Sequence, residues 1–366
     1  MTATLLPAPV RRIRSDIQSM AAYAVQDADG LLKLDAMENP HRLPPALQAE
    51  LGACLGAVAV NRYPGARVDE LKARIARHID LPAGHALMLG NGSDELISLL
   101  AMACDVPGAS ILAPLPGFVM YAMSARLQGL AFHGVPLTAE FELDEAAMLA
   151  AIGQHRPAIL YLAYPNNPTG TLWDAGTITR LIAAQGRQGG LVVMDEAYQP
   201  FAAHSWIEVV RADPAAHRHV LVMRTLSKFG LAGVRIGYLM GEAALVAEID
   251  KLRPPYNVSV LNAECALFAL EHADVFAAQA ADIRAQRAQL LAALAALPGV
   301  TPHPSQANMI LARVPDAARA FAGMRARGVL IKNVSTMHPL LANCVRLTVG
   351  TADENAQMLA ALQASL

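Results

Sequence analysis

The sequence predicts an α/β protein, with a large three-layer α/β/α domain on a mostly parallel sheet and a smaller α+β domain at its C-terminal end. Its 366 residues exceed the roughly 250–300 at which a single core stops growing. Hydrophobic residues make up 54% and charged residues 16%, which excludes a disordered chain. Short continuous apolar runs alternate with helical patterns, as in strands that are covered on both faces.

Residues 1–35 mix proline, arginine and short apolar pieces, and we expect an N-terminal arm with little structure of its own. Residues 36–58 are assigned to the small domain. Helical spacing of apolar residues predicts helices over Pro44–Ala57 and Val68–Ile79, on either side of a Pro/Gly turn at Tyr63–Gly65.

The large domain is expected over residues 59–250. Its apolar runs predict six strands, at Ala86–Leu89, Ser110–Ala113, Ala158–Ala163, Gly190–Asp195, His219–Arg224 and Ile236–Met240. Helices are predicted between several of them, from Asn91–Ser93 to about Cys104, across Gly117–Leu127 and over Asp174–Arg187.

The small C-terminal domain is expected over residues 251–366, where the pattern changes after Pro254 and Pro255. Long Ala/Leu/Arg helices fill residues 260–297, and a helix over Asp353–Leu366 closes the chain. Between them, short strands alternate with helices, at Asn308–Arg313, Val329–Lys332 and Val345–Val349.

Charge and residue usage exclude several classes of protein. Lys and Arg total 29 against 31 Asp and Glu, so there is no basic excess for nucleic acid. The longest apolar runs, such as Leu290–Leu297, are far shorter than the ~20 residues of a membrane span. The four cysteines form no CxxC pair, as expected for reduced core residues of a cytoplasmic protein. The histidines form no HExxH motif, and we expect no metal site.

Ligands of open α/β sheets bind beyond the carboxyl ends of the strands, so the residues after each strand are the candidates for a site. The first strand is followed by Gly90–Glu95. There Ser93 and Asp94 open a helix, whose free N–H groups and dipole favour an anion. An ordinary helix cap is the alternative reading.

Two further strands end in special residues. Tyr164–Gly170 brackets two asparagines with prolines, a rigid turn that aims an amide such as that of Asn167. Asp195–Tyr198 places a carboxylate at a buried strand end, which is costly unless the carboxylate meets a cation. A helix cap or a loop salt bridge also fits that carboxylate.

The next strand ends in Arg224–Lys228, and Arg235 follows after two glycines. Lys228 and Arg235 fit a solvated surface pair. The alternative is a desolvated lysine that acts as an amine nucleophile and forms a Schiff base.

Taken together, these strand ends match one ligand with a phosphate, a cationic ring nitrogen, a phenolate-like oxygen and an aldehyde. Pyridoxal 5'-phosphate carries all four groups, and the ordered set of motifs is a stronger signal than any single one.

The same motifs resemble those of the pyridoxal-phosphate-dependent aminotransferases of fold type I, class II, and most closely the histidinol-phosphate aminotransferase group, from about Leu32 to the C-terminus. The stretches that carry the resemblance are Leu34–Pro40, Asn61–Gly65, Gly90–Glu95, Tyr164–Gly170, Asp195–Tyr198, Thr225–Lys228, Gly233–Gly237 and Val345–Thr351.

The resemblance implies a role for each cofactor-binding residue. Lys228 is expected to bind the cofactor as a Schiff base and to move the proton, and Asp195 to pair with the ring nitrogen. Asn167 and Tyr198 are expected to bind the ring hydroxyl, and Phe118 to stack on the ring. The residues expected to bind the phosphate are Ser93, Asp94, Ser227 and Arg235, with Tyr63 contributed by the partner subunit of a homodimer with shared active sites.

For the substrate's anionic group, the resemblance points to Arg346, Lys332 and Tyr23. Lys332 stands where relatives often carry an arginine, which keeps the charge but loses the planar fork of donors. Met37 stands where asparagine is common, and it has no role in this prediction.

The implied reaction is amino transfer between histidinol phosphate and 2-oxoglutarate, in two half-reactions at one site, as part of histidine biosynthesis. Two alternatives in the same fold stay open: a threonine-phosphate decarboxylase of cobalamin synthesis, and an aromatic or aspartate aminotransferase. A non-catalytic pyridoxal-phosphate-binding regulator is disfavoured, because the roughly 35 residues before the first motif are too few for a DNA-binding domain.

Overall fold

The computed structural model describes residues 10–20 and 25–366, and these fall into two compact units, one up to Gly30 and one from Leu31 to Leu366. The first unit contains the helical turns η1 (Val10–Arg12) and α1 (Ser15–Gln18). Tyr23 lies outside the described residues. Within the described part of the chain, no helix combines the length and the apolar character that crossing a bilayer requires.

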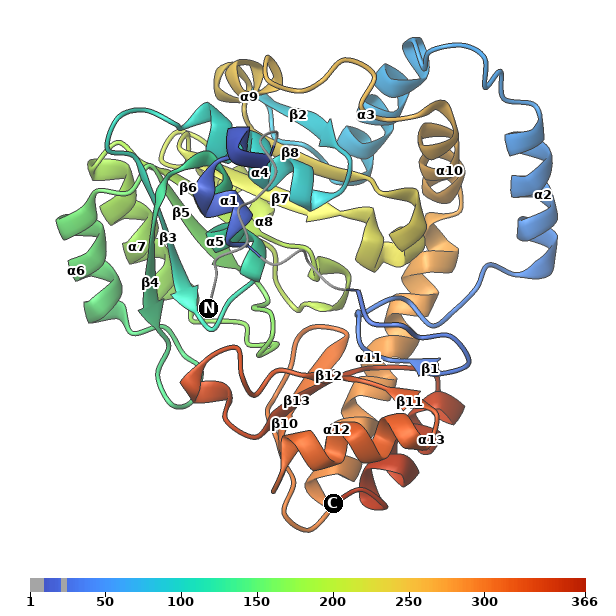
Figure 1. Ribbon diagram of the computed structural model, residues 1–366. Helices are drawn as coiled ribbons and strands as arrows, with labels where there is room; N and C mark the ends of the chain where they lie inside the picture. The colour runs from blue at the N-terminus through green and yellow to red at the C-terminus, as the bar shows by residue number, and fades with distance from the viewer. Residues whose placement is uncertain (1–9, 21–24) are drawn as a thin grey trace. The chain divides into compact units, whose positions relative to one another are not determined.

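A seven-stranded sheet with the order β2-β8-β7-β6-β5-β3-β4 forms the centre of the second unit (Figure 1). Four neighbouring pairs are parallel, whereas β8 runs antiparallel to both β7 and β2, so the mostly parallel sheet is confirmed. The strands are β2 (His85–Gly90), β3 (Ser110–Leu115), β4 (Ala131–Pro136), β5 (Ile159–Ala163), β6 (Leu191–Asp195), β7 (Val220–Thr225) and β8 (Gly237–Glu242).

Helices cover both faces of this sheet, because successive residues of its strands point to opposite sides. In β5, Ile159 and Tyr161 enter one core, while Leu160 and Leu162 enter the other. The first core contains α4 (Ser93–Ala103), α5 (Val119–Gln128) and α9 (Ala243–Asp250). The second contains α3 (Ala66–His78), α6 (Glu145–His155), α7 (Ala175–Arg187), α8 (Trp206–Ala212) and α10 (Val260–Glu271). The three-layer prediction is thereby confirmed.

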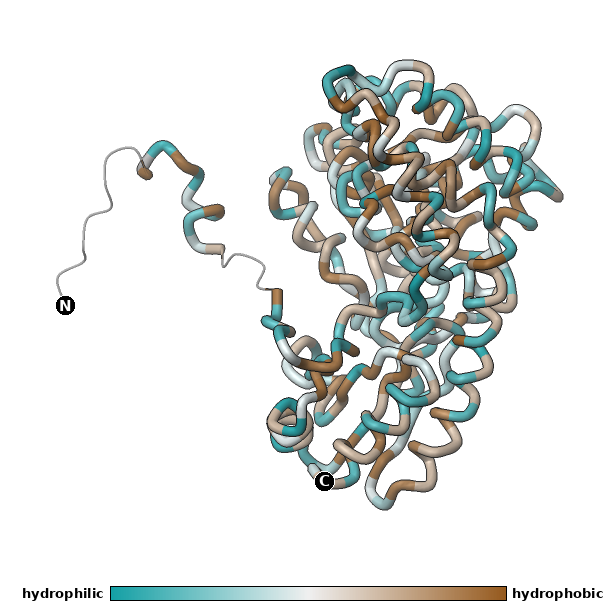
Figure 2. The backbone as a smooth tube through the Cα atoms, turned by 90° about the vertical axis from the view of Figure 1, so that its right-hand side faces the viewer, coloured by the Kyte–Doolittle hydropathy of each residue, from teal (hydrophilic) through white to brown (hydrophobic). Residues whose placement is uncertain are grey.

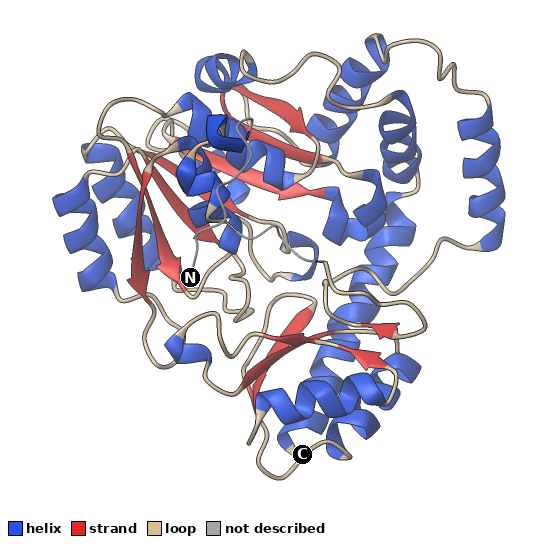
Figure 3. Ribbon diagram, viewed as in Figure 1, coloured by secondary structure: helices blue, strands red, loops and turns tan. Residues whose placement is uncertain are grey.

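A second, smaller sheet has the order β12-β13-β10-β9, and all its pairs are antiparallel (Figure 3). Beside it, β1 (Leu32–Lys33) pairs in parallel with β11 (Val329–Leu330). The remaining strands are β9 (Thr301–Pro302), β10 (Met309–Arg313), β12 (Lys332–Asn333) and β13 (Cys344–Thr348). A third core joins these strands to α11 (Ala273–Ala295), α12 (Ala317–Ala326) and α13 (Ala352–Gln363). Figure 2 shows hydrophobic stretches recurring through both the upper and the lower part of this unit, as separate cores require.

The sequence did not indicate β4 or the helix α6 that follows it. β4 pairs only with β3 and is the edge of the sheet, so it lacks the continuous apolar run of a strand covered on both faces. The helix begins after Asp144, whose carboxylate accepts a hydrogen bond from the Ala147 N–H at 3.0 Å.

The domain limits at residues 35, 58 and 250 stay predictions. β1 lies inside the stretch assigned to the arm. The helix α10 lies beyond residue 250, yet its Ala263, Ala266 and Leu267 pack in a core of the seven-stranded sheet. The helix α2 (Pro45–Gly56) has no buried residue and lies beside α10 at the rim of the unit (Figure 1).

Candidate active site

The carboxyl ends of β5, β6 and β7 lie side by side at one edge of the large sheet. Ala163 pairs with Asp195, and Asp195 in turn pairs with Met223. Because the three strands are parallel, the motifs that follow them converge at this edge. The sheet therefore brings Asn167, Asp195 and Lys228 to one place.

Asp195 is buried, with 4% of its surface exposed. Its carboxylate accepts hydrogen bonds from the Tyr121 hydroxyl at 2.6 Å and from the Ala197 N–H at 3.0 Å. Both donors are neutral, and burial raises the pKa of Asp195 to about 6. A cation placed against this carboxylate would lower its pKa again.

Tyr121 has no role in the prediction from the sequence. It lies three residues after Phe118 at the start of α5, and the two rings meet edge to face with centroids 5.6 Å apart. Its other neighbour is Tyr161, stacked at 4.3 Å. Helical spacing from Phe118 was the signal that would have pointed to Tyr121.

Lys228 lies in the helical turn η3 (Ser227–Leu231), directly after β7. Its Nζ donates a hydrogen bond to the Ala36 carbonyl at 2.8 Å and lies 5.9 Å from the centre of the Tyr198 ring. Burial, and after it the positive charge of Arg346, lowers the pKa of the amine to about 8. Part of the amine is therefore the free base near neutral pH, as a nucleophile must be.

Asn167 joins two other candidate residues. Its Nδ2 donates to the Tyr198 hydroxyl at 3.1 Å, and its Oδ1 accepts from Arg346 Nη1 at 2.7 Å. All three side chains are buried. Arg346 also donates to the Asp35 carbonyl at 2.8 Å, so its guanidinium is fixed in direction.

The predicted phosphate-binding residues meet where β8 begins, because Gly237 pairs with both Gly90 and Thr225. The backbones are in close contact there: a Cβ on Gly237 would lie 2.8 Å from the Ser93 nitrogen. Arg235 donates to the Ser227 hydroxyl at 3.4 Å from a left-handed backbone (φ 56°).

Gly92 and Asp94 lie next to Arg235 in this cluster of predicted phosphate-binding residues. A Cβ on Gly92 would lie 2.6 Å from the Arg235 guanidinium, so the glycine leaves room for that side chain. The carboxylate of Asp94 lies 3.6 Å from the same guanidinium. A carboxylate repels a phosphate, so Asp94 can contribute only its main-chain N–H, at the free N-terminus of α4.

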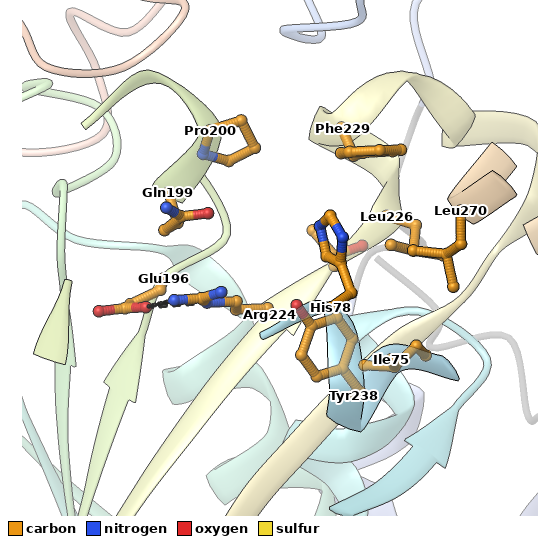
Figure 4. Close-up of a pocket in the computed structure, with 11 residues that line it drawn as sticks. Ile75, His78, Glu196, Gln199, Pro200, Arg224, Leu226, Phe229, Tyr238 and Leu270 are labelled. Carbon is orange, nitrogen blue, oxygen red and sulfur yellow. Dashed lines mark hydrogen bonds and ion pairs between the residues drawn. The ribbon is translucent and has the colours of Figure 1, made fainter. Parts of the chain in front are cut away.

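A buried ion pair joins the residue after Asp195 to the strand β7. Glu196 follows Asp195, and its carboxylate meets the Arg224 guanidinium at 2.8 Å (Figure 4). The Ser205 hydroxyl donates to the same carboxylate at 3.0 Å. Figure 4 shows this pair beside a pocket that His78, whose pKa is lowered by burial and by Arg224, also lines.

The remaining candidates, Lys332 and Tyr63, do not follow a strand of the large sheet. Lys332 and Arg346 are directly opposite each other in β12 and β13, and therefore lie on the same face of the small sheet. Tyr63 is 76% exposed and stacks on Tyr256, with ring centroids 4.2 Å apart.

The chain matches known proteins over nearly its full length. Residues 30–362 match the model of the family "Aminotransferase class I and II". A histidinol-phosphate aminotransferase of Methylibium petroleiphilum is 70% identical over 362 residues, which are 99% of this chain and 96% of that protein.

Two solved structures show the same fold. The histidinol-phosphate aminotransferase of Sinorhizobium meliloti, in complex with pyridoxal-5'-phosphate, superposes with a TM-score of 0.82 at 25% identity and covers 96% of each chain. The L-threonine-O-3-phosphate decarboxylase of Porphyromonas gingivalis superposes with a TM-score of 0.76 at 23% identity, covering 91% of this chain and 98% of that one. The second likeness concerns the fold alone.

Proposed function

The chain belongs to the class I and II aminotransferase family, and from this premise we propose that it transfers the amino group of L-histidinol phosphate to 2-oxoglutarate. The products are 3-(imidazol-4-yl)-2-oxopropyl phosphate and L-glutamate. The observation that carries the proposal is the 70% identity to a histidinol-phosphate aminotransferase over almost the whole of both chains.

The residues at the strand ends fit pyridoxal phosphate. The buried carboxylate of Asp195, with its raised pKa, calls for a cation such as a protonated ring nitrogen. The cradle of Ser93, Ser227 and Arg235 offers hydroxyl and guanidinium donors and a helix N-terminus to a phosphate. When bound, this cofactor supplies an aldehyde and a ring that withdraws electrons from the substrate carbon.

The side chains of the protein would then divide the work. The Lys228 Nζ would move a proton from the substrate carbon that bears the amino group to the aldehyde carbon of the cofactor, and in the reverse direction in the other half-reaction. The Asp195 carboxylate would hold the proton on the ring nitrogen. Asn167 and Tyr198 would bind the ring hydroxyl, and Phe118 would cover one face of the ring.

We place the anionic end of the substrate at Arg346 and Lys332. The two cations lie directly opposite each other on one face of the sheet, where like charges repel unless an anion joins them. A phosphate in one half-reaction and a carboxylate in the other fit the same pair. Tyr23 stays a prediction, because it lies outside the described residues.

We also propose a homodimer, with Tyr63 reaching the cofactor phosphate of the partner subunit. Its ring is exposed and supported by Tyr256. Tyr63 lines a pocket together with Cys54 of the helix α2 and Val260 of α10, and α2 has no buried residue although its sequence is largely apolar. Such a surface fits a partner protein. We place the protein in the cytoplasm, since all four cysteines are free.

Assaying two substrates side by side tests the reaction. The protein should form glutamate from histidinol phosphate and 2-oxoglutarate and release no carbon dioxide from threonine phosphate. Lys228→Ala, the control for contaminating activity, should slow the transfer at least about 10³-fold. Carbon dioxide release from threonine phosphate without amino transfer would replace our proposal by the decarboxylase.

A further inference from the structure

Three consecutive main-chain carbonyls, those of Asp35, Ala36 and Met37, each accept a hydrogen bond from a side chain, and two of the three donors belong to the site. The carbonyl of Asp35 accepts from Arg346 and that of Ala36 accepts from Lys228, both at 2.8 Å. The Met37 carbonyl accepts from Asn308 Nδ2 at 3.0 Å. Backbone therefore supports both the proposed nucleophile and the proposed anion-binding arginine.

The middle of this arrangement depends on an unusual conformation at Met37. Its φ is 52°, in the left-handed region that glycine and asparagine adopt most readily and that costs other residues free energy. Neighbouring groups hold it there: the Met37 N–H donates to the Thr348 hydroxyl at 3.1 Å, and Thr348 N–H donates to the Leu34 carbonyl at 3.1 Å. Such backbone persists only where the surroundings over-determine it, and it often marks a functional site.

We propose that Met37 is a positioning residue, whose left-handed backbone directs the Ala36 carbonyl at Lys228 and so holds the free ε-amine in place between its reaction steps. The torsion at Met37 sets the direction of the peptide that carries the Ala36 carbonyl. Lys228 has a flexible four-carbon stem, and this acceptor limits where its amine lies. The inference rests on the proposed role of Lys228 as the reacting amine.

The side chain of Met37 offers a competing explanation, because it is buried in the core of the small sheet. Two kinds of substitution separate the two roles. Met37→Ile keeps a similar apolar volume but disfavours a positive φ, since isoleucine is β-branched. Met37→Gly and Met37→Asn lose the apolar side chain but accept the left-handed backbone.

The measurement is competitive acetylation of the cofactor-free full chain with acetic anhydride, in which mass spectrometry quantifies the Lys228 peptide against pH. The pKa of the Lys228 amine is about 8. Losing a charge-assisted hydrogen bond lowers this pKa, so more of the amine is the free base at pH 7. The ratio of the Lys228 labelling rate at pH 7 to that at pH 10 should therefore be about fivefold higher in Met37→Ile than in the wild type. The rate at pH 10 corrects for any change in access to the amine.

Met37→Gly and Met37→Asn should keep the wild-type ratio. The proposal is overturned if Met37→Ile keeps that ratio, or if all three variants shift it equally. Should Met37→Ile not fold, Thr348→Val removes the hydroxyl that holds the Met37 N–H and should shift the ratio in the same direction. Since no substrate is present, a wrong assignment of the substrate would leave these results unchanged.

A second measurement, of steady-state kinetics in the cofactor-loaded protein, separates an effect on the position of the Lys228 amine from an effect on substrate binding. With glutamate as amino donor, Met37→Ile should lower kcat several-fold at nearly unchanged KM, and Met37→Asn should restore it. A rise in KM alone would contradict a role in placing the amine.

Discussion

Asp195 and Lys228 respond to burial in opposite senses. Burial raises the pKa of the carboxyl to about 6 and lowers that of the amine to about 8, because each loses the hydration of its charged form. For Lys228, burial thus brings the pKa toward neutral pH, where a proton carrier is most effective. For Asp195, the raised pKa belongs to the protein without a cation beside the carboxylate.

The stability of the cofactor-free protein should depend on Asp195. Its pKa is higher in the folded state than the ordinary 3.8, so the folded state binds the proton more tightly and stability falls as pH rises from about 4 through about 6. Asp195→Asn should remove this loss, which amounts to about 3 kcal/mol at pH 8. Urea unfolding of both proteins at pH 4 and pH 8 measures it.

The cofactor should reverse the sign of that effect. With pyridoxal phosphate bound, the wild type should gain more stability at pH 8 than Asp195→Asn, because only the carboxylate pairs with a ring cation. Equal gains in the two proteins would argue against a contact between Asp195 and the ring nitrogen.

Among the elements, β6 and β7 are joined at their ends by the Glu196–Arg224 pair. Removing one partner leaves a buried charge, so Glu196→Gln should destabilise the protein by about 3–5 kcal/mol. A double replacement by leucine at 196 and methionine at 224 should recover most of this loss. Glu248→Gln, in the exposed pair with Lys251, is the control and should leave Tm unchanged.

The pairing of β12 with β13 leads to a prediction about substrates. Lys332→Ala should reduce kcat/KM for histidinol phosphate about ten- to a hundredfold and for glutamate less, because a phosphate carries more charge than a carboxylate. Arg346→Ala should impair both half-reactions. Stopped-flow measurement of each half-reaction distinguishes them; equal losses with both substrates in Lys332→Ala would remove its claimed preference for phosphate.

For the whole molecule, the testable property is assembly. If Tyr63 acts in the partner's site, mixing Lys228→Ala with Tyr63→Ala yields heterodimers in which one site carries both defects and the other carries none. Activity should then recover to about a quarter of the wild-type value after subunit exchange, since half the dimers are mixed and each has one intact site. A fully active monomer, or a mixture no better than its parts, would refute the shared site.

The sequence predicted the buried strands and the residues after them, because strands covered on both faces are apolar throughout, as in β5 and β6. It did not predict β4, whose His133, Gly134 and Pro136 suit an edge. At the site, charged and amide side chains were visible as motifs. The carbonyl of Ala36 was not, since every residue has a carbonyl and only the fold decides which one faces Lys228.

The reversed direction of β8 explains why so much of the site comes from one short piece of chain. A strand parallel to β7 would have to begin at the amino ends of the strands, so the chain would need a crossover connection after β7. That crossover would separate Lys228 from Arg235. Because β8 runs back instead, β7 and β8 form a hairpin whose connection carries Ser227, Lys228 and Arg235 together. Any insertion or deletion in this connection moves Lys228 and Arg235 at once. If these residues bind the aldehyde and the phosphate of one ligand, as proposed, the distance between those two groups limits how far the length of the connection can vary.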